Sequence, residues 1–258
     1  MRNRLLIQRS SLLFPAGRTL MVNTNHPAYS GIRMACATVS TPGINTGAAN
    51  APFNLLGTGT FTAQTSLATR ANGQFPGVGP AYAGFGGNSG YSLAGQTVET
   101  LTSVTYGFIA LFCAGRSPSP DVFVCNNSSV SAGTGGFYAS IAGASTKPQI
   151  VVFSMGGTGT SRVSTLVIPI DRSVFIAGSV DGSTSNFVCT DLTDGQITSS
   201  STTGLTFAVN DGTVSYGGVG GNHLNLSYQG AGMFSAADLT MDQLLTWARN
   251  PWSFWYNV

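Results

Sequence analysis

The chain has 258 residues, of which 42% are hydrophobic and only 8% are charged. This length and apolar fraction can build one large all-β domain, or two small ones, around a sizeable core. The charged fraction is far below the about 25% of ordinary soluble domains. Because net charge keeps protein surfaces apart, so uncharged a surface is typical of a chain that works inside an assembly.

The net charge of +2 conceals an asymmetry along the chain. Residues 1–98 contain six arginines and no acid, whereas residues 99–258 contain five basic residues against nine acidic ones. A basic arm can bind nucleic acid, but these arginines form no basic run and are not interleaved with aromatic residues. An acidic protein surface is therefore the expected partner, and nucleic acid is not.

The cysteines and the apolar runs indicate a soluble protein made in the cytoplasm. Cys36, Cys113, Cys125 and Cys189 form no C-x-x-C pair and are not spaced with a histidine as zinc ligands, so we interpret them as small buried hydrophobes. The opening "MRNRLLIQRSSLLF" begins like a signal peptide. However, Arg9 interrupts its apolar stretch and no small-residue cleavage site follows. The longest apolar run, 106–115, is too short for a membrane-spanning helix, so no membrane partner is expected.

The sequence predicts an N-terminal arm followed by many short strands. Residues 1–25 form an arm of apolar stretches punctuated by arginine, and residues 26–40 predict a turn that leads into a strand. Between about 50 and 237, β-prone runs alternate with glycine-rich turns. The clearest runs are 108–113, 122–125, 137–141, 149–155, 162–168 and 173–180. Short strands without intervening helices predict a sandwich or barrel, and no linker divides it.

Three Asp-Gly dipeptides mark turns between these runs. They are Asp181-Gly182, Asp194-Gly195 and Asp211-Gly212. Asp-Gly between alternating residues favours a type I′ hairpin turn, which needs positive φ at both central positions.

A single amphipathic helix is predicted near the C-terminus. Thr240 can be its N-cap, with Gln243 closing a capping box and Leu239 stapled against Leu244. Its apolar stripe comprises Met241, Leu244, Leu245 and Ala248. Pro251 disfavours helix at the residue before it, so the helix should end at Asn250 and "WSFWY" should continue as an extended tail.

So short a helix does not persist alone in water. We therefore expect it to lie against the sandwich through Leu244, Trp247, Pro251 and Trp252, with the tail packed beside it.

The stretch "YQGAGMFSAADLTMDQLLTWARNPWSFW" (228–255) resembles the closing segment of concanavalin A-like, laminin-G-type jelly rolls of bacteriophage virion proteins. Those end with a strand, a short helix and Asn-Pro-Trp, which Asn250, Pro251 and Trp252 match. Residues 173–195 resemble the family's paired strands, and 26–40 its first strand. The resemblance implies an antiparallel jelly-roll β-sandwich spanning 26–258, with the arm 1–25 outside it. The helix departs from the family pattern at Asp242 and Gln243, and the arm has no counterpart.

Catalysis and nucleotide binding find little support in the residues. Glycoside hydrolysis normally needs two carboxylates flanking one bond, whereas Glu99 is the only glutamate and most aspartates lie in turns or near the terminal helix. There is no G-x-S-x-G elbow for a serine nucleophile. The glycine-rich stretches 84–90 and 156–162 lack a Gly-Lys-Ser/Thr phosphate loop. We therefore expect no enzyme and no cofactor.

Calcium and glycans are the remaining ligand classes. Some proteins of the resembling family bind calcium through aspartate at the sandwich rim, but Asp121 and Asp191 are interpreted here as ordinary loop residues. Tyr82, Phe85 and Tyr91 lie in a glycine-rich loop and are candidate glycan-binding residues. Trp252 and Trp255 are instead expected in the core or an interface.

The sequence favours a non-enzymatic virion structural protein, assembled in the host cytoplasm. The first hypothesis is a capsid decoration or cement protein that docks through its arm and contacts other virion proteins and copies of itself. The arm residues assigned to this docking are Arg2, Arg4, Arg9, Phe14 and Arg18. The alternative is an adsorption module of the tail or fibre that binds host surface glycans.

Overall fold

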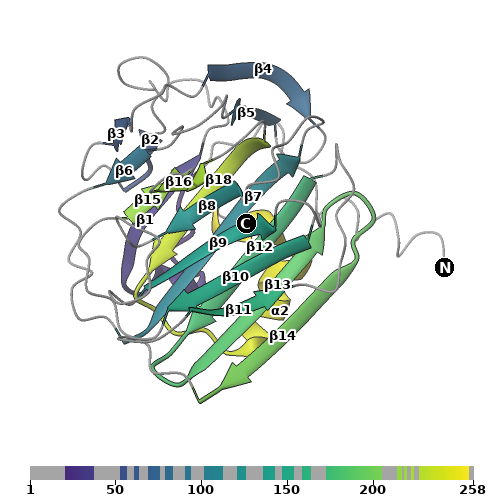
Figure 1. Cartoon of the computed structure of the whole chain (residues 1–258). Coiled ribbons are helices and arrows are strands. Elements are labelled where there is room, and N and C mark those ends of the chain that lie inside the picture. Colours follow the sequence, from purple (N-terminus) through teal and green to yellow (C-terminus); the bar gives the residue numbers. More distant parts are fainter. Residues whose placement is uncertain are drawn as a thin grey trace.

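Two antiparallel sheets make up most of the computed structural model, and a short helix lies near the C-terminus (Figure 1). The structure describes residues 21–37, 53–56, 61–63, 69–75, 79–83, 91–93, 102–112, 121–125, 136–142, 147–153, 159–163, 173–204, 214–216, 218–219, 222–223 and 227–255. The chain is an antiparallel, concanavalin A-like jelly-roll β-sandwich, which confirms the fold class expected from the sequence.

The first sheet carries the C-terminal helix. Along it, the strands follow the order β14 (Ile197–Thr203), β13 (Thr184–Asp191), β12 (Ser173–Val180), β7 (Val104–Phe112), β18 (Ser227–Ser235), β1 (Ile32–Ala37) and β2 (Phe53–Asn54). Two further strands join it beside β18, namely β4 (Thr69–Phe75) and β5 (Gly79–Ala83). The central strand β7 pairs with β12 from Val104 opposite Val180 to Leu111 opposite Ser173.

The second sheet lies over the opposite face of the first. Its strands follow the order β11 (Gly159–Val163), β10 (Lys147–Phe153), β9 (Gly136–Ala142), β8 (Asp121–Cys125), β15 (Val214–Tyr216), β6 (Tyr91–Leu93) and β3 (Phe61–Ala63). The short strands β16 (Gly218–Val219) and β17 (Asn222–His223) form a small ribbon beside β8.

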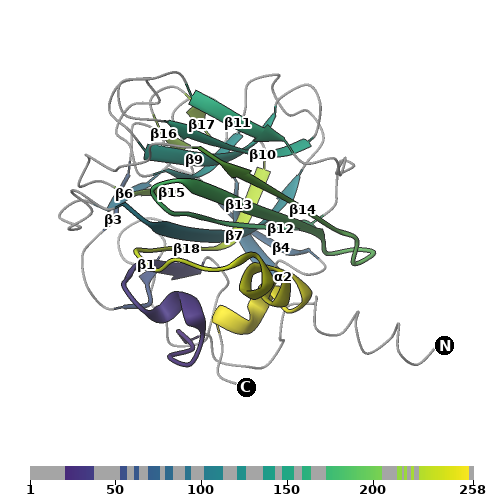
Figure 2. The same cartoon turned by 90° about the horizontal axis from the view of Figure 1, so that it is seen from below.

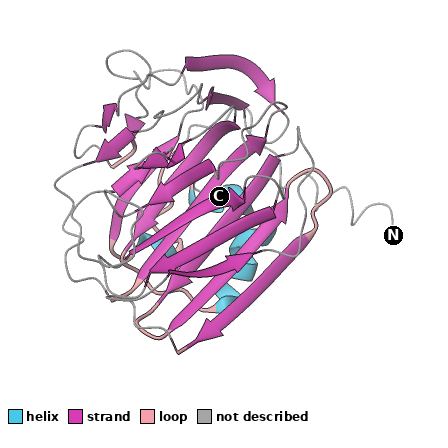
Figure 3. Cartoon of the chain, viewed as in Figure 1, coloured by secondary structure: helices cyan, strands magenta, loops and turns pink. Residues whose placement is uncertain are grey.

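The first sheet is therefore a middle layer. Figure 2 shows the second sheet on one side of it and the helix α2 (Met241–Arg249) on the other, and Figure 3 shows the helical segments gathered on that side. Along β12, Phe175 and Ala177 belong to the apolar cluster under the helix, and Val174 and Ile176 are buried on the alternate positions. Because both faces are covered, β12 is apolar almost throughout.

Trp247 of α2 lies directly on the backbone of β7. A Cβ added to Gly107 would lie 2.8 Å from Cζ2 of the Trp247 ring and still closer to Cη2. The ring also meets Phe175 edge-on at 5.1 Å between ring centroids, and its Nε1 donates to the carbonyl of Pro251 at 3.0 Å. The absence of a side chain at residue 107 thus sets how close the helix approaches the sheet.

The helix begins as the sequence predicts. Thr240 accepts a hydrogen bond from the Gln243 backbone while the Gln243 side chain accepts one from the Thr240 backbone, so the capping box is confirmed. The helix ends at Arg249, with Asn250 outside helical geometry before Pro251. Leu239 and Leu244 are both buried in the cluster beneath it.

Polar contacts hold both ends of the helical layer on the first sheet. The Thr190 hydroxyl of β13 donates to the Ala248 carbonyl at 2.9 Å, in the last turn of α2. At the other end, Ser179 Oγ of β12 accepts from the Leu239 backbone N–H at 2.9 Å, and Thr105 of β7 donates to the Ala237 carbonyl. These contacts satisfy backbone groups that would otherwise be buried without partners.

The C-terminal tail differs from the sequence-based prediction. Instead of an extended segment, residues after the helix form the 3₁₀ turn η2 (Pro251–Phe254). Proline favours the first position of such a turn because it has no N–H to leave unpaired. The turn places Trp252, Phe254 and Trp255 in the core, where none of the three is exposed.

The predicted type I′ turn at Asp181-Gly182 is also wrong. Positive φ occurs at Gly31, Gly195 and Gly204 among the described glycines, and Gly182 is not one of them. The Asp181 carboxylate instead accepts from the backbone N–H groups of Ser183 and Thr184, and the Asp181 N–H donates to the Thr184 carbonyl at 2.9 Å, so Gly182 and Ser183 are the central residues of the turn. The hydrogen bond from Ser183 is the main reason that the pKa of Asp181 is lowered.

Candidate functional site

The N-terminal segment is tied to the C-terminal tail. The Met21 N–H donates to the Trp255 carbonyl at 3.0 Å, and the Asn23 N–H donates to the Phe254 carbonyl at 2.9 Å. The Asn23 side chain adds a 2.9 Å hydrogen bond to the Ser253 carbonyl. Residues 21–25, which the sequence places in the arm, therefore lie against η2, beside α2.

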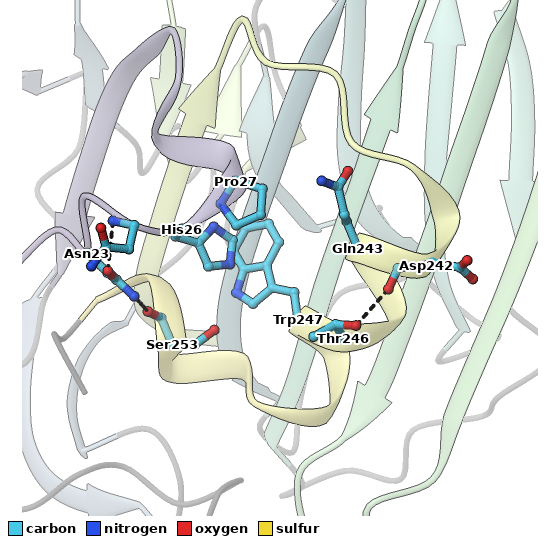
Figure 4. Close-up of a pocket in the computed structure, with 9 residues that line it drawn as sticks. Asn23, His26, Pro27, Asp242, Gln243, Thr246, Trp247 and Ser253 are labelled. Carbon is cyan, nitrogen blue, oxygen red and sulfur yellow. Dashed lines mark hydrogen bonds between the residues drawn. The ribbon is translucent and has the colours of Figure 1, made fainter.

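A pocket of about 370 Å³ opens where this segment faces the helix. Its lining comes from three places in the chain and consists of Asn23, Asn25, His26, Pro27, Asp242, Gln243, Thr246, Trp247 and Ser253. Figure 4 shows His26 and Pro27 beside the Trp247 ring, with Gln243 and Thr246 along the helix. Asp242 is the only carboxylate among these residues, and none of them is lysine or arginine.

His26 joins the pocket to the aromatic core. Only 9% of it is exposed, and its ring meets Trp247 at 4.8 Å and Phe254 at 5.3 Å between centroids. Its Nδ1 accepts the Ala28 N–H at 3.2 Å and so caps the 3₁₀ turn η1 (Pro27–Tyr29). Burial lowers the pKa of His26 from 6.5 to about 4.

The hydrogen bond to Nδ1 decides which nitrogen carries the proton. A neutral imidazole has one donor and one acceptor nitrogen, and the Ala28 N–H uses the acceptor. Nε2 is therefore the donor, and no described residue accepts its proton. At neutral pH this histidine can donate a hydrogen bond from Nε2 but cannot take up a proton there.

Several other polar groups of the lining are already used within the chain. Gln243 Oε1 accepts from Thr240, so its amide nitrogen remains as a donor. The Thr246 hydroxyl donates to the Asp242 carbonyl at 2.8 Å, so its oxygen remains as an acceptor. Asn23 Oδ1 accepts from the Asn25 N–H at 3.0 Å and Nδ2 donates to Ser253. The pocket thus offers both donors and acceptors to a ligand.

The residues singled out from the sequence fall into three groups. The residues expected to pack on the sandwich are all buried in α2 and η2, namely Leu244, Trp247, Pro251 and Trp252. The prediction that Tyr82 and Tyr91 share a glycine-rich loop is wrong, because Tyr82 lies in β5 of the first sheet and Tyr91 in β6 of the second. Arg2, Arg4, Arg9, Phe14, Arg18 and Phe85 lie outside the described residues. The pocket itself was missed, because no local pattern relates residues 23–27 to 242–253.

The described part of the chain holds no group of three or more histidine, cysteine or acidic residues that could bind a metal ion. Asp191, interpreted from sequence as a loop residue, is the last residue of β13 and is 2% exposed. Its carboxylate accepts the Thr193 N–H at 2.8 Å. Cys189 is a free, buried thiol, and burial raises its pKa well above 9.0.

Among the helices that the structure describes, none is both long and apolar enough to cross a membrane. No family model matches the sequence, and no curated protein matches it either.

Solved structures share the fold at very low sequence identity. Domain 4 of AbnA, a GH43 arabinanase of Geobacillus stearothermophilus in complex with arabinotriose, is 14% identical with a TM-score of 0.56. The match covers 85% of this chain and 98% of that one. The binding domain of Paraclostridial Mosquitocidal Protein 1 is 10% identical with a TM-score of 0.60. This match covers 84% of this chain and 52% of that one.

The ligand-binding domain of Botulinum neurotoxin serotype D, in complex with N-acetylneuraminic acid, is 7% identical with a TM-score of 0.55. This match covers 84% of this chain and 50% of that one. This chain therefore spans about half the length of the two toxin domains. At these identities the similarity establishes the β-sandwich fold.

The buried neutral state of His26 predicts acid-sensitive stability. The unfolded chain protonates this histidine near pH 6.5 but the folded chain only near 4. Its contribution is therefore complete above pH 6.5 and is lost as the pH falls towards 4, by about 3 kcal/mol in total. Urea unfolding at several pH values measures this loss. Asn at position 26 retains an acceptor for the Ala28 N–H. His26→Asn should therefore reduce the slope of the free energy of unfolding against pH. An equal slope in both proteins would contradict the assignment.

Proposed function

We propose that this chain is a non-enzymatic binding module of a bacteriophage virion and that its ligand is a host surface glycan. The observation that carries the proposal is the pocket between residues 23–27 and α2, which offers both donors and acceptors beside apolar walls. Binding pockets commonly combine an apolar lining with a few polar groups that fix the ligand. The virion assignment rests on the resemblance of residues 228–255 to phage jelly rolls.

The chemistry of the lining favours a polyhydroxylated ligand. Each hydroxyl group both donates and accepts, and the pocket presents His26 Nε2–H and the Gln243 amide as donors and Thr246 Oγ1 as an acceptor. The lining contains no lysine or arginine to pair with a phosphate. A structural neighbour solved in complex with arabinotriose, a neutral oligosaccharide, is consistent with this ligand class.

The same geometry argues for binding without catalysis. His26 is the pocket's only residue of a type that commonly serves as a base near neutral pH, but its acceptor nitrogen is taken by Ala28. Asp242 is the only carboxylate among the lining residues, whereas glycoside hydrolysis ordinarily needs two. We therefore expect a bound glycan to be released without any chemical change.

The proposal predicts saturable glycan binding by the full chain. On an immobilised panel of mono- and oligosaccharides, at least one glycan should retain the protein, and free sugar should compete. Chromatography of the incubated glycan should show no new product. Failure of every glycan on the panel to bind would contradict the binding function, and released product would contradict the non-enzymatic assignment.

The second candidate function, capsid decoration through the arm, is favoured by one feature of the sequence. Residues 1–20 combine four arginines with Leu, Ile and Phe and contain no acid, and contiguous apolar surface normally marks an interaction site. Arginine is also enriched at protein interfaces. Other virion proteins would be its partners, and a second copy of the chain could share the interface.

Removal of residues 1–20 tests this candidate. The shortened chain keeps Met21 and Asn23, which donate hydrogen bonds to the tail, so it should fold and melt like the full chain. Its occupancy on particles lacking the protein should fall sharply, and binding of the full chain should weaken in high salt without vanishing. Normal occupancy of the shortened protein would exclude docking through the arm.

A further inference from the structure

We infer that the pocket receives a single uncharged sugar residue and that Asp242, at its rim, excludes sugars that carry a carboxylate. This inference rests on the proposed glycan-binding function and specifies its ligand. It follows from the size of the pocket, from the placement of charge around it and from the hydrogen-bonding groups that remain unused within the chain.

The size of the pocket limits its occupant. A volume of about 370 Å³ lies near the lower end of the about 300–1,000 Å³ typical of ligand sites. Trp247 is 1% exposed, so its ring forms part of the wall instead of an open stacking platform. The site therefore accepts the end of a glycan, one ring deep, and leaves the remaining rings outside.

No charge is directed at the ligand. Among the lining residues no side chain is cationic, and His26 stays neutral because it is buried and its Nδ1 already accepts a hydrogen bond. Figure 4 shows the Asp242 side chain pointing away from His26 and Trp247. The pocket interior is thus uncharged, with apolar walls and a few polar groups, and a carboxylate placed in it would lose water without gaining a charged partner.

The N-terminus of α2 does not supply the missing positive charge. The first turn of a helix attracts anions through its unpaired N–H groups and its dipole. Here the backbone N–H of Gln243, the third residue of the helix, already donates to the Thr240 hydroxyl. Asp242 lies in the same first turn, and its negative charge offsets the helix dipole. Asp242 therefore acts against an acidic sugar at the rim of the pocket, because it offsets the attraction of the helix N-terminus for anions.

The groups that remain match an uncharged sugar. His26 is more than nine-tenths buried, lines the pocket and retains an Nε2–H that no described residue accepts. The Gln243 amide nitrogen is the second donor and Thr246 Oγ1 the acceptor. Two donors and one acceptor can hold adjacent hydroxyls of a neutral sugar.

Binding of the full chain to matched neutral and acidic glycans, measured by titration calorimetry, tests the inference. The wild-type chain should bind the best neutral glycan at least tenfold more tightly than its sialylated or uronic-acid counterpart. Asp242→Asn should strengthen binding of the acidic glycan and so reduce the ratio of the two affinities severalfold. Thr246→Val, which removes the acceptor, should weaken neutral binding by about three- to tenfold.

A filling variant and its control locate the site. Thr246→Trp, at an exposed helical position, should fill the pocket and abolish neutral binding, whereas Thr203→Trp on the exposed strand β14 should bind like the wild type. Melting temperatures close to the wild type verify that the variants fold.

The outcomes separate the inference from the function on which it rests. Preference for the acidic glycan, or neutral binding that Thr246→Trp does not change, would overturn the inference while leaving a glycan-binding protein. No binding of either glycan would overturn both.

Discussion

The contact between Trp247 and the backbone of Gly107 positions the helical segments on the first sheet. These segments cover the outer face of that sheet, which is the face turned away from the second sheet (Figure 2). Because residue 107 has no side chain, the indole ring lies directly on β7, and α2 approaches the sheet closely. The ring then supports Phe254 and Trp255 of the tail and His26 of the N-terminal segment. One large side chain thus brings the two ends of the described chain together, and the pocket lies between them.

The local features of the helical layer could be predicted from the sequence, whereas its long-range features could not. A capping box needs only Thr240 and Gln243 three residues apart, and Pro251 ends a helix by its own geometry. The turn η2 was missed because the tail's apolar residues suit a strand equally well. Its conformation is chosen by burial of Trp252 and Trp255 against partners far away in sequence.

The strands show the same division. β12 was recognised with its bounds because a strand covered on both faces is apolar throughout. β14 (Ile197–Thr203) was not recognised, since a sheet-edge strand of serine and threonine carries no hydrophobic period. The pocket depends on both kinds of information: Gln243 and Thr246 follow from the helix, but their juxtaposition with His26 depends on the hydrogen bonds of residues 21–23 to the tail.

The functional proposal follows from how the polar groups around this contact are used. In the pocket, the acceptor nitrogen of His26 already accepts a hydrogen bond from the Ala28 N–H. What remains free is a small set of neutral donors and acceptors over a rigid aromatic base, which suits recognition of a ligand in one orientation. Such recognition needs a site held in one geometry, and Trp247 contacts the rings of His26, Phe254 and Trp255 beside the pocket.

The most direct test of this account is a double-mutant cycle between Gly107 and Trp247, measured as free energies of unfolding in urea. Gly107→Ala should cost about 1–3 kcal/mol, because its Cβ overlaps the ring. In the Trp247→Phe background, which lacks that part of the ring, the same change should cost at least about 1 kcal/mol less. Gly182→Ala, at an exposed loop position with space for a Cβ, is the control and should change stability by less than about 0.5 kcal/mol. A neutral Gly107→Ala, or equal costs in both backgrounds, would contradict the central role of this contact.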